Sequence, residues 1–137
     1  ADIDALVAEV VANTNSMEFD VTNDGLVTFA DVQQWLLDVG SSQGIAIVQG
    51  DANLDGLVDV SDFNLWNRNK FTSGNAWCGG DFNADGNTDV GDFNLWNQNK
   101  FGGPFAVPEP GLPLSMIVLL GFMAEWRRRV AGVRCVQ

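Results

Sequence analysis

A 21-residue stretch decides the fold: Asp51–Phe71, with the sequence DANLDGLVDVSDFNLWNRNKF. It recurs at 81–101 as DFNADGNTDVGDFNLWNQNKF, and 15 of the 21 positions are identical. A weaker copy, DVTNDGLVTFAD, precedes both at 20–31, and the Trp35 that follows it occupies the repeat position of Trp66 and Trp96. The chain is therefore built around three copies of one short unit, which begin 31 and 30 residues apart.

Each copy begins with a 12-residue stretch in which oxygen-bearing side chains recur at fixed positions. We call the stretches 20–31, 51–62 and 81–92 loops 1, 2 and 3. Position 6 is Gly in every loop, and positions 1, 3, 5, 9 and 12 carry Asp, Asn or Thr. The candidate side-chain ligands are Asp20, Thr22, Asp24, Thr28 and Asp31 in loop 1, Asp51, Asn53, Asp55, Asp59 and Asp62 in loop 2, and Asp81, Asn83, Asp85, Asp89 and Asp92 in loop 3.

This spacing predicts calcium binding. Ca²⁺ takes six to eight oxygens at ~2.3 to 2.6 Å, and a 12-residue loop supplies them from alternating side chains, the position 7 carbonyl and a closing carboxylate. The carbonyl donors would be those of Leu26, Leu57 and Asn87. Mg²⁺ is less suited, because it needs tighter octahedral geometry and retains several waters. We predict two calcium ions, in loops 2 and 3, and a third, more weakly held ion in loop 1, which has fewer carboxylates.

The alternative is that Asn-x-Asp-Gly is simply a turn, for which Asn, Asp and Gly are the usual residues. A turn gives no reason to place carboxylates at positions 1, 9 and 12 as well, in two copies. The repeated spacing therefore favours the metal.

After loops 2 and 3 come apolar, Asn-rich stretches, 60–71 and 90–101, that we expect to form short helices. Their aromatic residues, such as Phe63 and Trp66, are expected in the core. The segments before these loops are rich in Gly and Ser, so no incoming helix is expected there. Before loop 1, by contrast, apolar residues follow helical spacing at Ile3, Leu6, Val7, Val10 and Val11. The prediction is an all-α fold of tandem loop–helix repeats with an additional N-terminal helix–loop–helix.

Composition excludes several classes of function. Asp and Glu number 18 against seven Lys and Arg, which gives a net charge of −11. Such a field repels nucleic acids, whose binding depends on basic side chains. The chain has no His and only two Cys, which removes most catalytic triads and zinc sites. Every cluster of carboxylates belongs to a loop, so we predict that the protein is not an enzyme.

Tandem loop-then-helix units that start Gly-Asp-x-Asn-x-Asp-Gly and close with Asp at position 12 resemble type I dockerin domains over residues 50–101. The resemblance implies two calcium ions, an antiparallel pair of helices and a cohesin-like protein partner bound on a helix face. In that family, positions 10 and 11 of each loop help to select the partner, often through Ser or Thr. These positions are Val60, Ser61, Val90 and Gly91.

The C-terminal segment resembles a PEP-CTERM sorting signal. Its three parts are Val107, Pro108, Glu109 and Pro110, an apolar run at 111–124, and the cluster Arg127, Arg128 and Arg129. The run of 14 residues is short against the ~20 of a membrane span, and a buried or interfacial helix is the alternative. An Arg cluster after an apolar run keeps that end cytoplasmic. The resemblance implies an exosortase-type processing enzyme, cleavage near 108–110 and transient anchoring in the inner membrane.

The expected organisation has five segments. They are an EF-hand-like unit at 1–40, a linker at 41–49, a dockerin-like domain at 50–101, a linker at 102–106, and a sorting signal with a short hydrophobic helix at 107–137. No intrachain disulfide is expected between Cys78 and Cys135. We interpret the chain as the C-terminal piece of a longer exported bacterial protein, with removal of a signal peptide as the alternative. Its predicted function is non-catalytic docking in the cell envelope; the alternative is a calcium-stabilised stalk or spacer without a protein partner.

Overall fold

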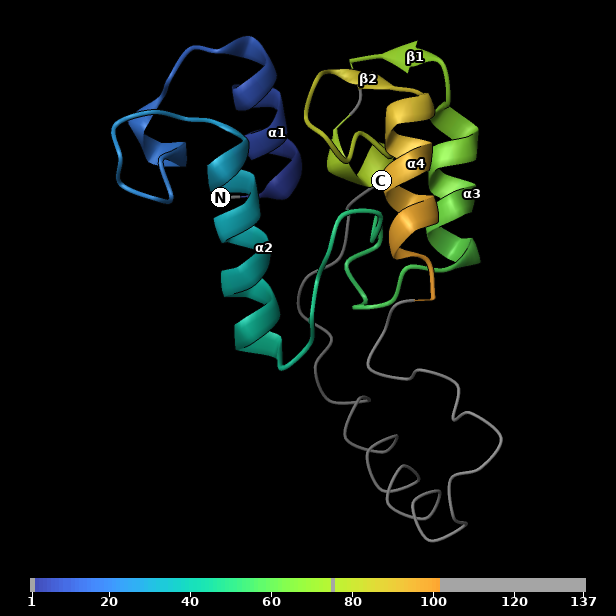
Figure 1. Ribbon diagram of the computed structural model, residues 1–137. Coiled ribbons are helices and arrows are strands. Elements are labelled where there is room, and N and C mark those ends of the chain that lie inside the picture. The colour runs from blue at the N-terminus through green and yellow to red at the C-terminus, as the bar shows by residue number, and fades with distance from the viewer. Residues whose placement is uncertain (1, 75, 102–137) are drawn as a thin grey trace, which may run out of the picture.

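The computed structural model describes residues 2–74 and 76–101. Within these residues the elements are α1 (Ile3–Ala12), η1 (Met17–Phe19), α2 (Phe29–Gln43), α3 (Val60–Asn69), β1 (Thr72–Ser73), η2 (Trp77–Gly79), β2 (Asn87–Thr88) and α4 (Val90–Asn99) (Figure 1). A mainly helical fold is confirmed. The expectation of an all-α fold misses one element, because β1 and β2 pair antiparallel with Thr72 opposite Thr88.

The three helices that follow a loop begin in the same way. Position 9 of the loop is the N-cap, and its side chain accepts a hydrogen bond from a backbone N–H of the first turn. Position 12 accepts one from the backbone of the N-cap, which completes a capping box. The pairs are Thr28 and Asp31 for α2, Asp59 and Asp62 for α3, and Asp89 and Asp92 for α4. Two of the predicted ligand positions therefore also fix where each helix starts.

The N-terminal unit, which we take as residues 2–47, contains a helix–loop–helix, as expected. Helix α1 packs against α2, and both contribute buried side chains to their contact. Helix α2 continues through Gln43 and ends at Gly44, whose φ of +68° is a conformation that glycine adopts readily. Residues 41–43 thus form the last turn of α2, and Ile47, further along the expected linker, is buried in the core.

Helices α3 and α4 lie side by side and run in opposite directions (Figure 1). Their aromatic side chains meet across the contact, with ring centroids 5.0 Å apart for Phe63 and Trp96 and 5.2 Å apart for Trp66 and Phe93. Trp66 and Trp96 are buried and the two phenylalanines are half-buried. The predicted placement of these residues in the core is confirmed.

Each of these two helices is also hydrogen-bonded to the other repeat. The indole N–H of Trp66 donates to the Asp89 carbonyl, and that of Trp96 donates to the Asp59 carbonyl, both at 2.9 Å. Two further pairs of hydrogen bonds repeat this exchange. The side-chain amide of Asn69 donates to the Gly79 carbonyl, and that of Asn99 to the Gln49 carbonyl. The backbone N–H of Phe71 donates to the Thr88 carbonyl, and that of Phe101 to the Val58 carbonyl. The two repeats are therefore interlocked by an approximate two-fold relation.

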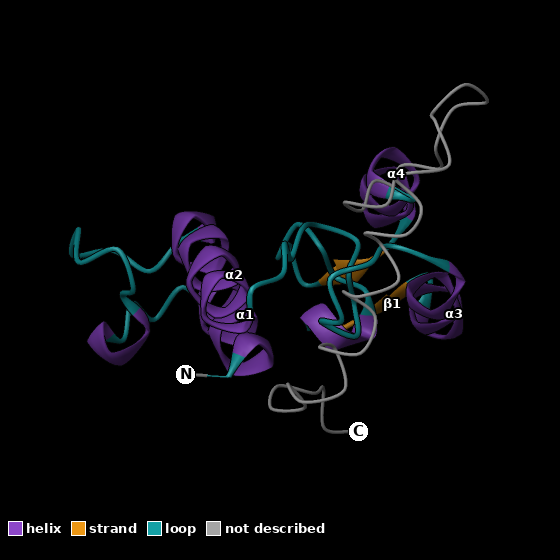
Figure 2. Cartoon of the chain, turned by 90° about the horizontal axis from the view of Figure 1, so that it is seen from below, coloured by secondary structure: helices purple, strands orange, loops and turns teal. Residues whose placement is uncertain are grey.

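Loops 2 and 3 lie between the α1–α2 pair and the α3–α4 pair (Figure 2). The apolar residues at positions 2 and 4 are buried, namely Ala52 and Leu54 in loop 2 and Phe82 and Ala84 in loop 3. Trp77 of η2 is fully buried beside them, and its indole N–H donates to the Asp51 carbonyl at 2.8 Å. One hydrophobic cluster thus runs from α1 through the loops to α4.

Several predictions concern segments that the structure does not describe. The linker at 102–106, the apolar run at 111–124 and the sorting motifs all lie outside the described residues. Within the described part of the chain, no helix is long and apolar enough to cross a membrane. Cys78 is disulfide-bonded, so the prediction of no intrachain disulfide is wrong; the other half of this bond lies outside the described residues.

Candidate metal centre

Position 1 of each loop folds the loop around its carboxylate. Asp51 accepts hydrogen bonds from the N–H groups of Asp55 at 3.2 Å and Gly56 at 2.8 Å. Loop 3 repeats both bonds around Asp81, at 3.2 and 2.8 Å, and loop 1 repeats them around Asp20, at 3.2 and 2.9 Å. All three loops therefore adopt the same turn.

Positions 3 and 5 tighten this turn. Asp55 accepts from the Leu57 N–H, Asp85 from the Asn87 N–H, and Asp24 from the Leu26 N–H, each at 2.9 Å. In loops 2 and 3 the position 3 amides add a second link. Asn53 Nδ2 donates to Asp55 Oδ2 at 3.1 Å, and Asn83 Nδ2 to Asp85 Oδ2 at 2.8 Å.

Position 12 returns to the start of the loop and closes it. Asp62 Oδ1 accepts from the N–H groups of Ala52 at 2.9 Å and Asn53 at 3.1 Å, while its Oδ2 accepts from Asp59 at 2.8 Å. Asp92 makes the equivalent three bonds in loop 3, and Asp31 receives the N–H groups of Thr22 and Thr28 in loop 1. Hydrogen bonds thus link the side chains of positions 1, 5 and 12 to the backbone of each loop, whereas the side chain of position 9 caps the following helix. The ligand assignment itself stays a prediction.

Loops 2 and 3 bury carboxylates without a compensating cation. Asp51, Asp62, Asp81 and Asp92 have no accessible surface. Burial, with a smaller contribution from neighbouring carboxylates, raises the pKa of Asp51 to about 7 and that of Asp81 to about 6. Burial also raises the pKa of Asp62 and of Asp92. Among the described residues, no Lys or Arg lowers any of these four pKa values. Buried carboxylates of this kind are normally paired with a cation or bound to a metal.

The donor set fits a hard cation. Within residues 2–74 and 76–101, no three carboxylate, imidazole or thiolate side chains form a metal cluster by themselves. A calcium ion in loop 2 would also use the amide oxygen of Asn53, the carbonyl of Leu57 and water, which are ordinary calcium ligands. Asn83 and Asn87 would supply the equivalent oxygens in loop 3. Every one of these donors is an oxygen, as calcium prefers.

Loop 1 has the same turn in more open surroundings. Asp20 is partly exposed, and Thr22, Asp24 and Thr28 are exposed. Burial tends to raise the pKa of Asp31, but hydrogen bonds from Thr28 and Thr22 outweigh it and hold that pKa below its usual value. Asp31, at position 12 of loop 1, is therefore more easily ionised in the folded chain without a cation than Asp62 and Asp92, the equivalent residues of loops 2 and 3.

Sequence reasoning missed Asn15, which supports loop 1. Its side chain accepts from the Val27 N–H at 2.5 Å and donates to the Gly25 carbonyl at 3.2 Å. In loop 3 the Gly86 carbonyl accepts from Gly74 N–H instead, beside the β1–β2 pair. Because Asn15 lies outside the repeated positions, the alignment of the repeats carried no signal for it.

The predicted partner-selecting positions lie in the first turns of α3 and α4. Val60 and Val90 are 58% and 54% exposed, and Ser61 and Gly91 are also exposed. Their outward position follows from the capping boxes, which turn Asp62 and Asp92 into the loops.

Comparison of the chain with protein-family models, with curated proteins and with solved structures finds no match.

Proposed function

We propose that this chain is a calcium-stabilised, dockerin-like docking module of an exported bacterial protein, without catalytic activity. The observation that carries the proposal is the set of four fully buried carboxylates, Asp51, Asp62, Asp81 and Asp92, that no described cation neutralises. A Ca²⁺ ion in each of loops 2 and 3 would supply the missing positive charge. Loop 1 would bind a third ion more weakly.

Calcium binding in this arrangement is coupled to folding. Positions 9 and 12 cap α3 and α4, so a cation that holds these residues also holds the start of each helix. The two helices in turn donate hydrogen bonds from their tryptophans to the opposite loop. Removing calcium would therefore leave repelling carboxylates in both loops and weaken the helix pair as a whole.

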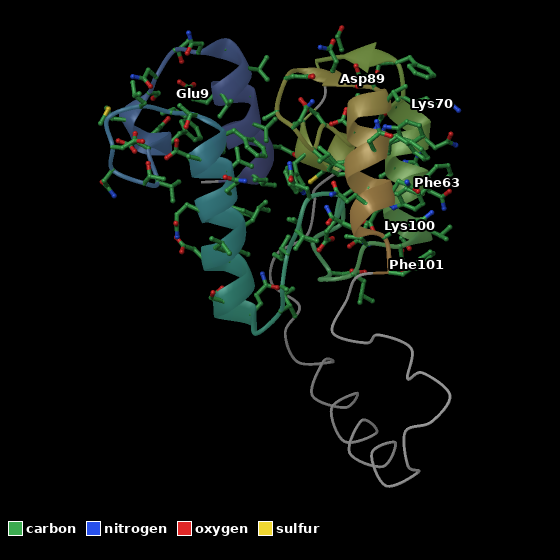
Figure 3. The ribbon with its side chains drawn as sticks, in the orientation of Figure 1. Glu9, Phe63, Lys70, Asp89, Lys100 and Phe101 are labelled. Carbon is green, nitrogen blue, oxygen red and sulfur yellow. The ribbon has the colours of Figure 1, made fainter. Side chains whose placement is uncertain are left out.

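The α3–α4 pair supplies the docking face. The only acids within the two helices, Asp62 and Asp92, are buried, so the helices expose no negative charge. The three bases of the described chain, Arg68, Lys70 and Lys100, all lie on or directly after these helices. Figure 3 shows Lys70 and Lys100 toward opposite ends of the pair, with Phe101 just beyond Lys100.

Apolar side chains frame this face. Phe71 and Phe101, 70% and 69% exposed, follow α3 and α4, and Val60 and Val90 begin them. A complementary partner would present acidic side chains between small apolar pockets, and a cohesin-like protein is the partner class that we propose. Exposed apolar residues rimmed by polar ones are typical of protein interaction sites.

The sorting function rests on the sequence of the C-terminal segment. We propose that Val107–Pro110, the apolar run and Arg127–Arg129 direct the protein to an exosortase-type enzyme and hold it transiently in the inner membrane. The mature protein would then reside in the cell envelope or outside the cell. Extracellular calcium, at millimolar concentration, keeps weak loops of this type occupied.

A calcium-stabilised stalk or spacer is the second candidate. It is favoured by the continuous hydrophobic cluster, which joins the N-terminal unit to both repeats. The docking proposal and the stalk proposal share the calcium sites and differ only in whether the α3–α4 face binds a partner.

Calorimetric titration tests the metal sites. After chelation, the 137-residue chain should bind two or three calcium ions, and Asp51→Ala and Asp81→Ala should each bind one fewer. Calcium affinity in Asp51→Ala equal to that of the parent would refute the ligand assignment.

Pull-down of envelope proteins separates docking from a stalk. A docked partner should be retained with calcium, released by chelator, and lost when Val60 and Val90 are both replaced by Asp. Leu37→Asp, at a 61% exposed position on α2, is the matched control and should retain the partner. Retention that ignores both calcium and the Val60 and Val90 substitutions would count against docking on this face.

A further inference from the structure

The glycines at position 6 have the same backbone conformation and different surroundings. Their φ angles are +87° for Gly25, +84° for Gly56 and +87° for Gly86. A Cβ added at Gly25 would meet nothing within 4 Å. At Gly56 it would lie 3.1 Å from the Ile45 Cβ, and at Gly86 only 2.8 Å from the Val11 Cγ1. Two residues of the N-terminal unit therefore cover these turns: Ile45 covers the turn of loop 2, and Val11 covers the turn of loop 3.

Polar contacts accompany this covering. The Asp4 carboxylate, in the first turn of α1, accepts a hydrogen bond from the Cys78 N–H at 2.9 Å, just before loop 3. Gln49 Nε2, which follows the N-terminal unit, donates to the Phe82 carbonyl inside loop 3 at 3.0 Å. Helix α1 also packs directly against η2. The contact is thus built from apolar and polar groups together.

Position 4 of the loops differs in burial in the same way as position 6. At position 4, loop 1 has an exposed asparagine, Asn23, whereas loops 2 and 3 have Leu54 and Ala84, which are 3% and 7% exposed. All three residues have φ between 56° and 60°, a region that asparagine tolerates better than leucine. Leu54 keeps this conformation because its side chain is packed in the core.

We propose that the N-terminal unit, residues 2–47, is an intramolecular brace that sets the calcium affinity of loops 2 and 3. Val11 of α1 lies against Gly86 of loop 3, and Ile45 lies against Gly56 of loop 2. This inference rests on the calcium proposal above. Because coupling between two equilibria is reciprocal, a calcium ion in either loop also holds the brace in place. Calcium would then control how firmly the N-terminal unit is joined to the docking helices.

A double-mutant cycle on the 137-residue chain tests the brace. Amide hydrogen exchange followed through a calcium titration gives a midpoint for each loop. Gly86→Ala should raise the midpoint of loop 3 by about tenfold or more, because strain at φ +87° adds to the clash with Val11. Adding Val11→Ala removes the clashing methyl group and should recover about threefold or more of that loss.

Gly25→Ala is the matched control. It imposes the same backbone strain in loop 1, where a Cβ meets open space. It should therefore raise the loop 1 midpoint less than Gly86→Ala raises that of loop 3, and Val11→Ala should leave its effect unchanged. Equal losses at the two glycines, or simple additivity of Gly86→Ala and Val11→Ala, would overturn the brace.

Single substitutions on the brace keep the test valid if Gly86→Ala fails to fold. Val11 is 45% exposed, so Val11→Ala should fold, raise the loop 3 midpoint by about threefold and leave loop 2 unchanged. Ile45→Ala should shift loop 2 instead, and the exposed control Leu37→Ala should shift neither. Calcium binding that ignores Val11 and Ile45 overturns only the brace, whereas a parent chain that binds no calcium overturns the calcium proposal and the brace together.

Discussion

Loop 1 and the pair formed by loops 2 and 3 share one hydrogen-bonded turn and differ in what surrounds it. Asp20, Asp51 and Asp81 each accept the backbone N–H groups of positions 5 and 6. Loop 1 leaves its position 4 residue and its glycine exposed, whereas loops 2 and 3 fold theirs against the core and the N-terminal unit. The repeated residues specify the turn. If calcium binds as proposed, the surroundings decide how strongly each loop depends on it.

The largest expected effect separates the two kinds of loop at position 1. With calcium present, Asp81→Ala should destabilise the chain by about 3 kcal/mol or more, since it removes a buried acceptor and the bound ion. Asp20→Ala removes a partly exposed acceptor and should cost about 1 kcal/mol. Thermal unfolding in calcium measures both. Equal losses would show that burial does not distinguish the loops.

A second effect concerns position 4. Leu54→Ala should cost about 2 to 3 kcal/mol, because it empties a buried site in loop 2. Asn23→Ala loses only a residue that tolerates positive φ and should cost under about 1 kcal/mol. Denaturant unfolding of the two variants provides the comparison. A cost at Asn23 that matched the cost at Leu54 would contradict the assignment of loop 2 to the core.

The calcium-free chain should lose stability as the pH rises. A carboxyl whose folded pKa lies above its ordinary 3.8 binds more protons folded than unfolded, so the free energy of unfolding falls between that value and the folded pKa. Asp51, with a pKa of about 7, and Asp81, with a pKa of about 6, place this loss between pH 4 and 7.

Asp31 in loop 1 acts in the opposite sense. Its lowered pKa favours the folded state above 3.8, and this contribution disappears as the pH falls below that value. The melting temperature in chelator should thus be higher at pH 5 than at pH 7.5, and calcium should reverse the order. A calcium-free chain that is more stable at pH 7.5 would contradict the burial of uncompensated carboxylates in loops 2 and 3.

The smallest effects concern residues that belong to one region alone. Asn15→Ala should cost about 1 kcal/mol and speed amide exchange in loop 1, because Val27 and Gly25 lose their partner. Ser61→Ala, at an exposed position, should leave stability within about 0.5 kcal/mol and calcium binding unchanged, and should alter only partner choice. Faster amide exchange in loop 3 of Asn15→Ala would show that Asn15 supports more than loop 1 and would contradict this prediction.

Sequence periodicity predicted the parts that each repeat specifies by itself. Helices α3 and α4 follow their loops as expected, and Asp62 and Asp92 lie in their first turns. The turn around each loop also follows from its Asp, Asn and Gly residues. These features are local, so the spacing within one repeat was enough to predict them.

The spacing within one repeat could not predict the contacts between repeats. Near-identical copies do not reveal that Trp66 donates to the opposite loop, or that Phe71 and Thr88 meet beside a strand pair. The positions of Val11 and Ile45 against the loop glycines depend on how the N-terminal unit docks, which no repeated residue encodes. The disulfide of Cys78 was not predicted, because the prediction of no intrachain disulfide rested on the resemblance of the C-terminal segment to a sorting signal and not on any repeated position.

The central claim is that calcium in loops 2 and 3 holds the fold together. The most direct test is to chelate the 137-residue chain and add calcium back while recording far-UV circular dichroism and calorimetric stoichiometry together. The account predicts that two or three ions bind and that helical signal is gained as loops 2 and 3 fill. No binding, or binding without a gain of helix, would contradict it.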